Sequence, residues 1–257
     1  MKILITNDDG IHALGIRHLA DAVADFGEVK VVAPDRERSA CGHAMTMTEP
    51  LRVNEFDWGD AVKAYSVTGV PVDCVNVGLS HLYPDGCDLV LSGFNHGPNL
   101  GFDVTYSGTV AGAMEGAING IHSIAFSMAR FSGKENHFES GSSWLKDHFE
   151  WLLSLKLPQR TFLNINLPAM PYDEIKEARF VKMGGRVYRD RVEQRMDPWD
   201  RPYFWQGGLE IGGNPEPGTD FEAVVQGHVS ITPISLNWTD NIALVSLQNS
   251  AIPTHQV

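Results

Sequence analysis

Two adjacent aspartates near the N-terminus are the first residues whose types suggest chemistry. Asp8 and Asp9 follow the short apolar run at residues 2–6 and precede Gly10. Adjacent carboxylates repel each other unless they share a proton or a cation. A hard divalent cation with oxygen ligands, Mg²⁺ or Mn²⁺, is the simplest partner for such a pair. Taken alone, the triplet could also be a solvated turn in which an aspartate caps the next helix.

Two further oxygen donors follow other apolar runs. Ser39 ends the Asp-Arg-Glu-Arg-Ser loop after residues 29–33, and Asn95 lies in a Gly- and Asn-rich loop after residues 88–92. A hydroxyl and an amide oxygen are neutral ligands that suit the same hard cation, although a lone loop serine can equally be a turn residue. His96 is a candidate general acid, but a loop histidine can equally be exposed or structural.

A candidate anion site lies at the start of a predicted helix. Ser107, Gly108 and Thr109 precede the Ala- and Gly-rich segment 110–121. Backbone N–H groups at a helix N-terminus bind anions, and hydroxyls add donors; Asn99 could add an amide donor. The ordinary alternative is a helix N-cap. Neither GxxxxGK[ST] nor GxGxxG occurs, so Walker-type triphosphate binding and dinucleotide binding are unsupported.

The elements around these residues predict how they come together. The first 35 residues or so of the chain predict a βαβ unit. It consists of a buried strand, an amphipathic helix that ends at Gly27, and a second strand. Further strands are predicted at 88–92, 124–128 and 162–165, with a helix at 143–155. We expect a Rossmann-like, three-layer α/β core with a mostly parallel sheet over residues 1–168. Ligands of such sheets bind at the C-terminal strand ends, where all the candidate residues fall.

The remaining chain, residues 169–257, has a different character. We expect a β-rich arm or lobe there, with short strands at 229–232 and 243–247, that takes part in oligomerisation without forming an independent domain. An arginine- and aromatic-rich cluster could guide an anionic substrate and stack a base, or it could form a subunit interface. Its members are Arg186 to Arg201 with Tyr188 and Trp199, followed by Tyr203, Phe204 and Trp205.

Composition limits the classes of partner. The 257 residues carry a formal net charge of −12, which argues against duplex nucleic acid because such binding needs cationic contacts to phosphates. Cys41, Cys74 and Cys87 lack a CxxC pattern, so neither a disulfide framework nor a zinc site is expected. No window approaches the ~20 apolar residues of a membrane span, and we expect a cytoplasmic protein that does not enter membranes.

Several long segments, in order, resemble the SurE family of stationary-phase survival proteins and 5′(3′)-nucleotidases. The resemblance covers essentially the whole chain and rests on ILITNDDGIHALGIRHLADAV, VVAPDRERSACGHAMT, SGFNHGPNLGFDVTYSGTVAGAMEG and PGTDFEAVVQGHVSITPI. It implies that Asp8, Asp9, Ser39 and Asn95 bind one divalent metal, and that Ser107, Gly108 and Thr109 bind phosphate. It also implies a C-terminal arm that is exchanged between subunits in homodimers or homotetramers. The chain departs from the family pattern at His228, where tyrosine is common, and at Ser235, where some members have histidine.

The predicted activity is that of a metal-dependent phosphomonoester hydrolase, a 5′-nucleotidase. The resemblance implies nucleoside 5′- and 3′-monophosphates as substrates, and short polyphosphate for some members. With Asp8, Asp9 and Asn95 as catalytic residues, water would attack phosphorus in line while the cation neutralises developing charge. Two alternatives are a nucleotide- or metal-binding regulatory module without turnover and an aspartyl-phosphate phosphatase of the haloacid-dehalogenase type. The latter spaces its carboxylates as DxD, which the adjacent pair here disfavours.

Overall fold

A nine-stranded sheet forms the centre of the computed structural model, which describes residues 1–59, 62–131, 135–185, 191–207 and 215–248. The strand order is β3-β4-β2-β1-β5-β6-β7-β11-β8. The strands are β1 (Lys2–Thr6), β2 (Glu28–Pro34), β3 (Val53–Phe56), β4 (Lys63–Val67), β5 (Leu89–His96), β6 (His122–Ala129), β7 (Thr161–Pro168), β8 (Lys176–Phe180) and β11 (His228–Ser235).

Most neighbouring strands run parallel, which confirms the predicted fold class. The pairs β1–β2, β1–β5, β2–β4, β5–β6 and β6–β7 are parallel, whereas β3–β4 and β7–β11 are antiparallel. Strands β8 and β11 lie after residue 168 in the chain and still belong to this sheet. The C-terminal part of the sequence therefore extends the same sheet that carries the N-terminal βαβ unit.

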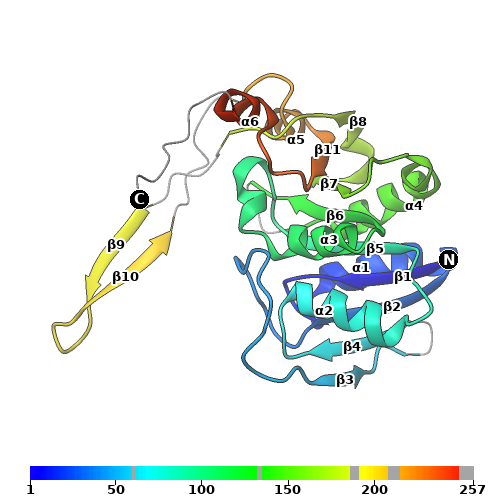
Figure 1. Ribbon diagram of the computed structural model, residues 1–257, viewed down its shortest axis with the longest axis horizontal. Helices are drawn as coiled ribbons and strands as arrows, with labels where there is room; N and C mark the ends of the chain where they lie inside the picture. Colours follow the sequence, from blue (N-terminus) through cyan, green and yellow to red (C-terminus); the bar gives the residue numbers. More distant parts are fainter. Residues whose placement is uncertain (60–61, 132–134, 186–190, 208–214, 249–257) are drawn as a thin grey trace, which may run out of the picture.

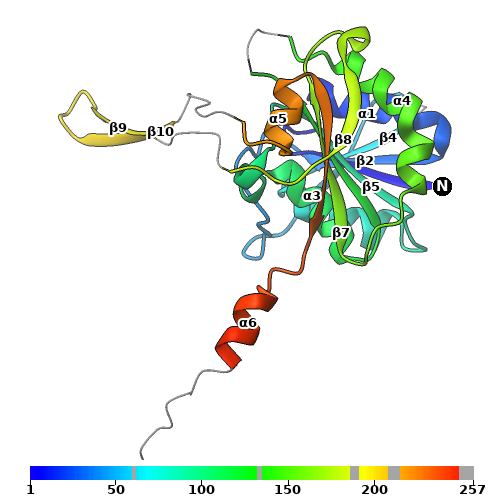
Figure 2. The ribbon, with the colours of Figure 1, turned by 90° about the horizontal axis from the view of Figure 1, so that it is seen from above.

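Helices cover both faces of the sheet and complete three layers (Figures 1 and 2). Helices α1 and α4 pack against each other on one face, and α2 and α3 pack together on the other. The helices are α1 (Leu14–Val23), α2 (Pro71–Val77), α3 (Gly108–Ile118), α4 (Phe138–Ser154), α5 (Asp220–Val225) and α6 (Asn241–Gln248), with short helical turns η1 (Ala24–Phe26), η2 (Gly78–Leu82), η3 (Gly101–Thr105) and η4 (Tyr172–Glu174).

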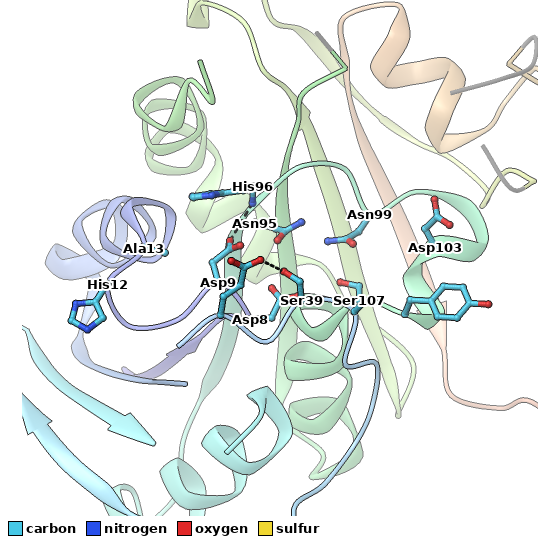
Figure 3. A pocket seen from close by; sticks show the side chains of 13 residues that line it. Asp8, Asp9, His12, Ala13, Ser39, Asn95, His96, Asn99, Asp103 and Ser107 are labelled. Carbon is cyan, nitrogen blue, oxygen red and sulfur yellow. Dashed lines mark hydrogen bonds between the residues drawn. The ribbon is translucent and has the colours of Figure 1, made fainter. Parts of the chain in front are cut away.

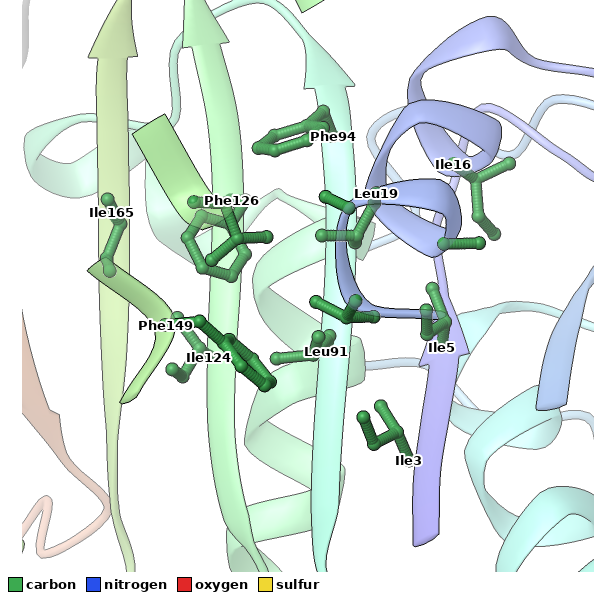
Figure 4. Close-up of a cluster of buried hydrophobic side chains, with 14 of the residues drawn as sticks. Ile3, Ile5, Ile16, Leu19, Leu91, Phe94, Ile124, Phe126, Phe149 and Ile165 are labelled. Carbon is green, nitrogen blue, oxygen red and sulfur yellow. The ribbon is translucent and has the colours of Figure 1, made fainter. Parts of the chain in front are cut away.

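The core follows the alternation of side chains along the strands. Ile3 and Ile5 belong to the cluster under α1 and α4, whereas Leu4 between them belongs to a cluster on the α2 side. Figure 4 shows the first cluster, in which Phe149 of α4 and Leu19 of α1 meet the strands. Central strands that are apolar on both faces are typical of parallel sheets covered by helices on each side.

Small residues let α3 approach the sheet closely. A Cβ placed on Gly112 would lie 2.6 Å from Thr6 Cγ2, and one on Gly116 would lie 2.4 Å from Ser123 Oγ. Because α3 begins at the candidate anion site, this close packing sets the height of that site above the sheet.

The strand predicted at residues 243–247 is wrong, because these residues lie in helix α6. Short apolar runs do not by themselves distinguish strand from helix. Here Asp240 decides the outcome: its Oδ1 accepts hydrogen bonds from the backbone N–H groups of Ile242 and Ala243, at 3.0 and 2.9 Å. Such capping satisfies donors that the first helical turn leaves unpaired.

A separate two-stranded antiparallel hairpin stands away from the main sheet (Figures 1 and 2). It consists of β9 (Arg191–Met196) and β10 (Pro202–Gly207). Trp199, Phe204 and Trp205, which belong to the arginine- and aromatic-rich cluster, are 60–74% exposed. Three other members, Arg186, Tyr188 and Arg189, lie outside the described residues. Among the described helices, none has the length and apolar character needed to cross a membrane.

Candidate active site

A polar cavity of about 550 Å³ opens at the C-terminal ends of β1 and β5. Figure 3 shows Asp8, Asp9, Ser39 and Asn95 gathered around one part of it, with Asn99 and Ser107 further along. The structure thus brings together candidates that are far apart in sequence. The lining residues are Asp8, Asp9, His12, Ala13, Glu37, Ser39, Ala40, Asn95, His96, Asn99, Asp103, Tyr106 and Ser107.

The turn after β1 is closed by Asn7. Its side chain donates to the Gly10 carbonyl at 3.1 Å and accepts from the Gly10 N–H at 3.2 Å. Gly10 has φ +93°, and a Cβ there would lie 2.9 Å from the carbonyl carbon of Arg36. Only glycine combines this backbone conformation with such a close approach, which presses the aspartate turn against the loop that carries Ser39.

Asp8 is the more buried carboxylate, at 5% exposure. Burial raises the pKa of Asp8, while hydrogen bonds from the Thr109 hydroxyl and from the backbone of Gly108 and Thr109 oppose that rise. In this structure, therefore, the first turn of α3 already interacts with one carboxyl group, the Asp8 side chain.

Asp9 lies further into the cavity and accepts a hydrogen bond from the His96 backbone N–H at 3.2 Å. Burial, and then the neighbouring charge of Asp8, raise the pKa of Asp9 to about 7, with a smaller contribution from Glu37. Crowding carboxylates in a partly desolvated space is unfavourable unless a proton or cation offsets their charge.

Ser39 is held opposite the aspartates by two backbone anchors of its loop. The Arg38 N–H donates to the Asp8 carbonyl at 2.7 Å, and the Gly42 N–H donates to the Tyr106 carbonyl at 2.9 Å. The Ser39 hydroxyl itself donates to Glu37 Oε1 at 2.6 Å, so the serine oxygen keeps its lone pairs for another partner.

Asn95 and His96 point in different directions at the end of β5. Asn95 Nδ2 donates to the Gly97 carbonyl at 2.9 Å. The Asn95 amide oxygen is therefore the atom of this side chain that could bind a cation. The His96 ring packs on Phe138, with 5.0 Å between ring centroids, and Figure 3 shows it directed away from Asn99 and Ser107. Burial lowers the pKa of His96.

The four predicted phosphate-binding residues divide into two groups. Ser107 and Asn99 line the cavity, whereas Gly108 and Thr109 contact Asp8 and are not part of the lining. Ser107 Oγ also caps α3 by accepting from the Val110 N–H at 3.0 Å. The Asn99 side-chain amide donates to Ser127 Oγ at 2.8 Å. Ser107 is therefore both the N-cap of α3 and a residue of the cavity lining.

The donor set fits a hard divalent cation better than a soft metal. Among the described residues, no group of three or more His, Cys, Asp or Glu side chains is placed to hold a metal ion. The side chains of Asp8, Asp9, Ser39 and Asn95, which carry two carboxylates, one hydroxyl and one amide oxygen, line the same part of the cavity instead (Figure 3). Oxygen-only sets of this kind suit Mg²⁺ or Mn²⁺.

Six other lining residues were not assigned a role from the sequence: Ala13, Ala40, His12, Glu37, Asp103 and Tyr106. The neighbouring motifs are the sequence signal for Glu37 and Tyr106: Glu37 lies within the Asp-Arg-Glu-Arg-Ser loop of Ser39, and Tyr106 directly precedes Ser107. His12 and Asp103 carry no such signal, because their place at the cavity depends on how two loops fold back.

A mostly parallel, three-layer α/β protein with a polar pocket at the strand ends belongs to the class whose members bind small ligands at that edge.

The family model of survival protein SurE matches residues 3–190. The protein named 5′-nucleotidase SurE in Pelobacter propionicus is 48% identical over 93% of this chain and 95% of its own length. Its namesake in Geobacter sulfurreducens is 43% identical over 97% and 93%. The crystal structure of the SurE protein from Aquifex aeolicus superposes with a TM-score of 0.83 at 43% identity, covering 96% of this chain and 98% of that one. The chain belongs to the SurE family.

Proposed function

We propose that this protein is a cytoplasmic, divalent-cation-dependent hydrolase that releases phosphate from nucleoside 5′-monophosphates. One observation carries the proposal: Asp8, Asp9, Ser39 and Asn95 line the same cavity beside the first turn of α3. Burial raises the pKa of each aspartate, a cost of carrying charge there that a bound cation would offset. The relatives named 5′-nucleotidase, which match over nearly their full lengths, support the same activity.

Each part of the cavity has a proposed role. Asp8, Asp9, Ser39 and Asn95 would hold the cation, which when bound neutralises charge that develops on the phosphate. Asp8 or Asp9 would orient the attacking water, because both carboxylates would adjoin the bound cation. The turn 107–109 would receive the phosphate, with Ser107 and Asn99 facing it and with Gly108 and Thr109 fixing Asp8 from below.

The decisive assay measures phosphate release from AMP with Mn²⁺, with and without a chelator. Asp9→Asn removes one charge from the cation site but keeps the size of the side chain, so we expect turnover to be lost and the fold to persist. Asp21→Asn is the matched control, because this exposed aspartate of α1 does not line the cavity. Wild-type turnover in Asp9→Asn would rule the cation site out.

The same assay separates the alternatives. AMP binding without phosphate release would indicate a regulatory module. A trapped covalent phospho-enzyme would indicate the aspartyl-phosphate mechanism. Comparing 5′-AMP, 3′-AMP and tripolyphosphate tests the wider substrate range, which we propose because the resemblance to the family implies it.

We also propose that the protein forms homodimers or homotetramers through its C-terminal part. Trp199, Phe204 and Trp205 on the hairpin and Ile242 and Leu247 on α6 are at least 60% exposed. Large apolar side chains gathered on projecting elements are typical of interaction surfaces. Light scattering of Trp205→Ser and of a chain shortened before residue 241 should show smaller assemblies than the wild type; unchanged mass for both would exclude this surface.

A further inference from the structure

A buried asparagine pair on β7 holds the backbone of one cavity residue. Asn166 Oδ1 accepts from the Asn99 N–H at 2.8 Å, and its Nδ2 donates to the Asn99 carbonyl at 3.0 Å. Asn164 Nδ2 donates to the same carbonyl at 2.8 Å. Both asparagines are fully buried. Since they are two residues apart on a strand, they project from the same face of the sheet.

A buried aspartate from the C-terminal part of the chain holds the loop two residues further on. Asp220 Oδ2 accepts from the Gly101 N–H, and Asp220 Oδ1 accepts from the Gly184 N–H, both at 2.8 Å. Asp220 is fully buried in the first turn of α5. A Cβ on Gly101 would lie 2.5 Å from the Gly185 carbonyl oxygen, so the two backbone segments touch.

Leu100, between these two anchors, is also fixed. It is 2% exposed and packs in one cluster with Ala129, Phe221 and Val224. Three consecutive loop residues are therefore bound by side chains from β7 and α5. Such fully hydrogen-bonded buried groups hold one conformation strongly, because breaking any of them leaves an unpaired polar group in the interior.

We propose that Asn164, Asn166 and Asp220 are positioning residues for the phosphate side of the cavity. None of the three lines it. They act through the loop that runs from Asn99 through η3 (Gly101–Thr105) to Ser107, both ends of which do line it. The inference rests on the proposed function, because it assigns these residues to the phosphate side of that same site.

The cation side of the cavity is anchored differently. Asp8 and Asp9 are held by their own turn, by Thr109 and by the His96 backbone. Loosening residues 99–101 should therefore weaken use of the substrate and change cation binding little, because the Ser39 loop, although it contacts Tyr106, is also anchored to the Asp8 backbone. A misplacement of about 1 Å in a group that contacts substrate can reduce the rate by about 100-fold.

The test compares Asn166→Ala, Asn164→Ala and Asp220→Asn with Tyr83→Phe. The Tyr83 hydroxyl donates to the Glu28 carbonyl at 2.7 Å, at the opposite end of the sheet from the cavity, so this control also loses a hydrogen bond that is partly buried. The measurements are kcat and KM for AMP, the Mn²⁺ concentration for half-maximal activity, and hydrogen exchange at the Asn99 and Gly101 amides.

We expect kcat/KM to fall by about 10- to 100-fold in Asn166→Ala and Asp220→Asn, and less in Asn164→Ala, with the Mn²⁺ requirement unchanged. The control should keep wild-type kcat/KM. Wild-type kcat/KM in folded Asn166→Ala and Asp220→Asn would overturn the proposal, as would an equal loss in the control. If the other two do not fold, Asn164→Ala, which removes one donor only, decides.

Hydrogen exchange keeps this proposal separate from the proposed function. If the wild type releases no phosphate from AMP, the hydrolase proposal fails on its own. Exchange at Asn99 and Gly101 then reports the positioning directly: faster exchange confined to these amides and their loop supports it. Wild-type protection in Asn166→Ala and Asp220→Asn refutes it.

Discussion

Substituting Gly112 with alanine should impair the active site more than it impairs stability. An added methyl group would lie 2.6 Å from Thr6 Cγ2 and 2.7 Å from Ser92 Oγ. The first distance is about 0.8 Å less than the 3.4 Å at which ordinary contact begins. The Ser92 hydroxyl can rotate, whereas the Thr6 methyl sits on a buried strand, so helix α3 must shift away from β1.

Two effects on the free energy of unfolding oppose each other. Overpacking of a close contact costs about 1–3 kcal/mol, while replacing glycine by alanine inside a helix gains about 1 kcal/mol. We therefore expect a net loss of about 0–2 kcal/mol, which leaves the protein folded. The shift of α3, however, carries Ser107 and the contacts to Asp8 with it, and kcat/KM should fall by about 10- to 100-fold.

The assay is phosphate release from AMP with Mn²⁺, together with urea unfolding. Thr6→Ser in the Gly112→Ala background removes the methyl group that causes the clash and should restore much of the activity. Gly185→Ala is the control, because a Cβ there meets no atom within 4 Å. Wild-type kcat/KM in Gly112→Ala would refute the link between helix height and the site.

Three further predictions concern the cation, the pH dependence and the core. Mn²⁺ at about 100 times its dissociation constant should stabilise the wild type by about 2.7 kcal/mol, or about 5–10 °C in melting temperature, and Asp9→Asn should lose this shift in a thermal scan. Glu115→Gln should lose about 1–2 kcal/mol at neutral pH, because the hydrogen bond from His43 holds the pKa of Glu115 below its usual 4.5. That contribution is present above pH 4.5 and is lost as pH falls through the folded-state pKa, so urea curves of variant and wild type should converge in acid. Phe149→Ala should cost about 3–5 kcal/mol with little effect on kcat/KM, since this fully buried ring packs on Phe26 away from the cavity; a large loss of activity with unchanged stability would contradict the separation of core and site.

Local patterns were sufficient to predict five of the parallel strands. The strands expected at 2–6, 29–33, 88–92, 124–128 and 162–165 all occur, because each is a short apolar run bounded by turn residues. The region between residues 51 and 87 was not anticipated, and it forms β3, β4 and α2. Strand β3 is largely exposed and carries Asn and Glu at its centre, so its sequence lacks the buried pattern that identifies a strand.

The candidate site, like the fold, could be predicted from the sequence only in part. Asp8, Asp9, Ser39 and Asn95 could be placed together from the sequence because parallel strands end at one edge. Their individual hydrogen bonds could not, since these depend on tertiary contacts: the Thr109 hydroxyl is directed to Asp8, and the Asn99 amide to Ser127. The contribution of Asp220 was also missed, because its contact with Gly101 joins segments that no local pattern connects.

The anchoring of Gly101 by Asp220 has a consequence for how the protein is made. The N-terminus of a chain leaves the ribosome first, so Asp8 and Asn95 emerge long before α5 does. The loop from Asn99 to Ser107 gains its last buried partner only when most of translation is over. Nascent chains and fragments that end before this helix would thus carry the acidic residues without an ordered partner loop, which delays the completed site until the polypeptide is nearly finished.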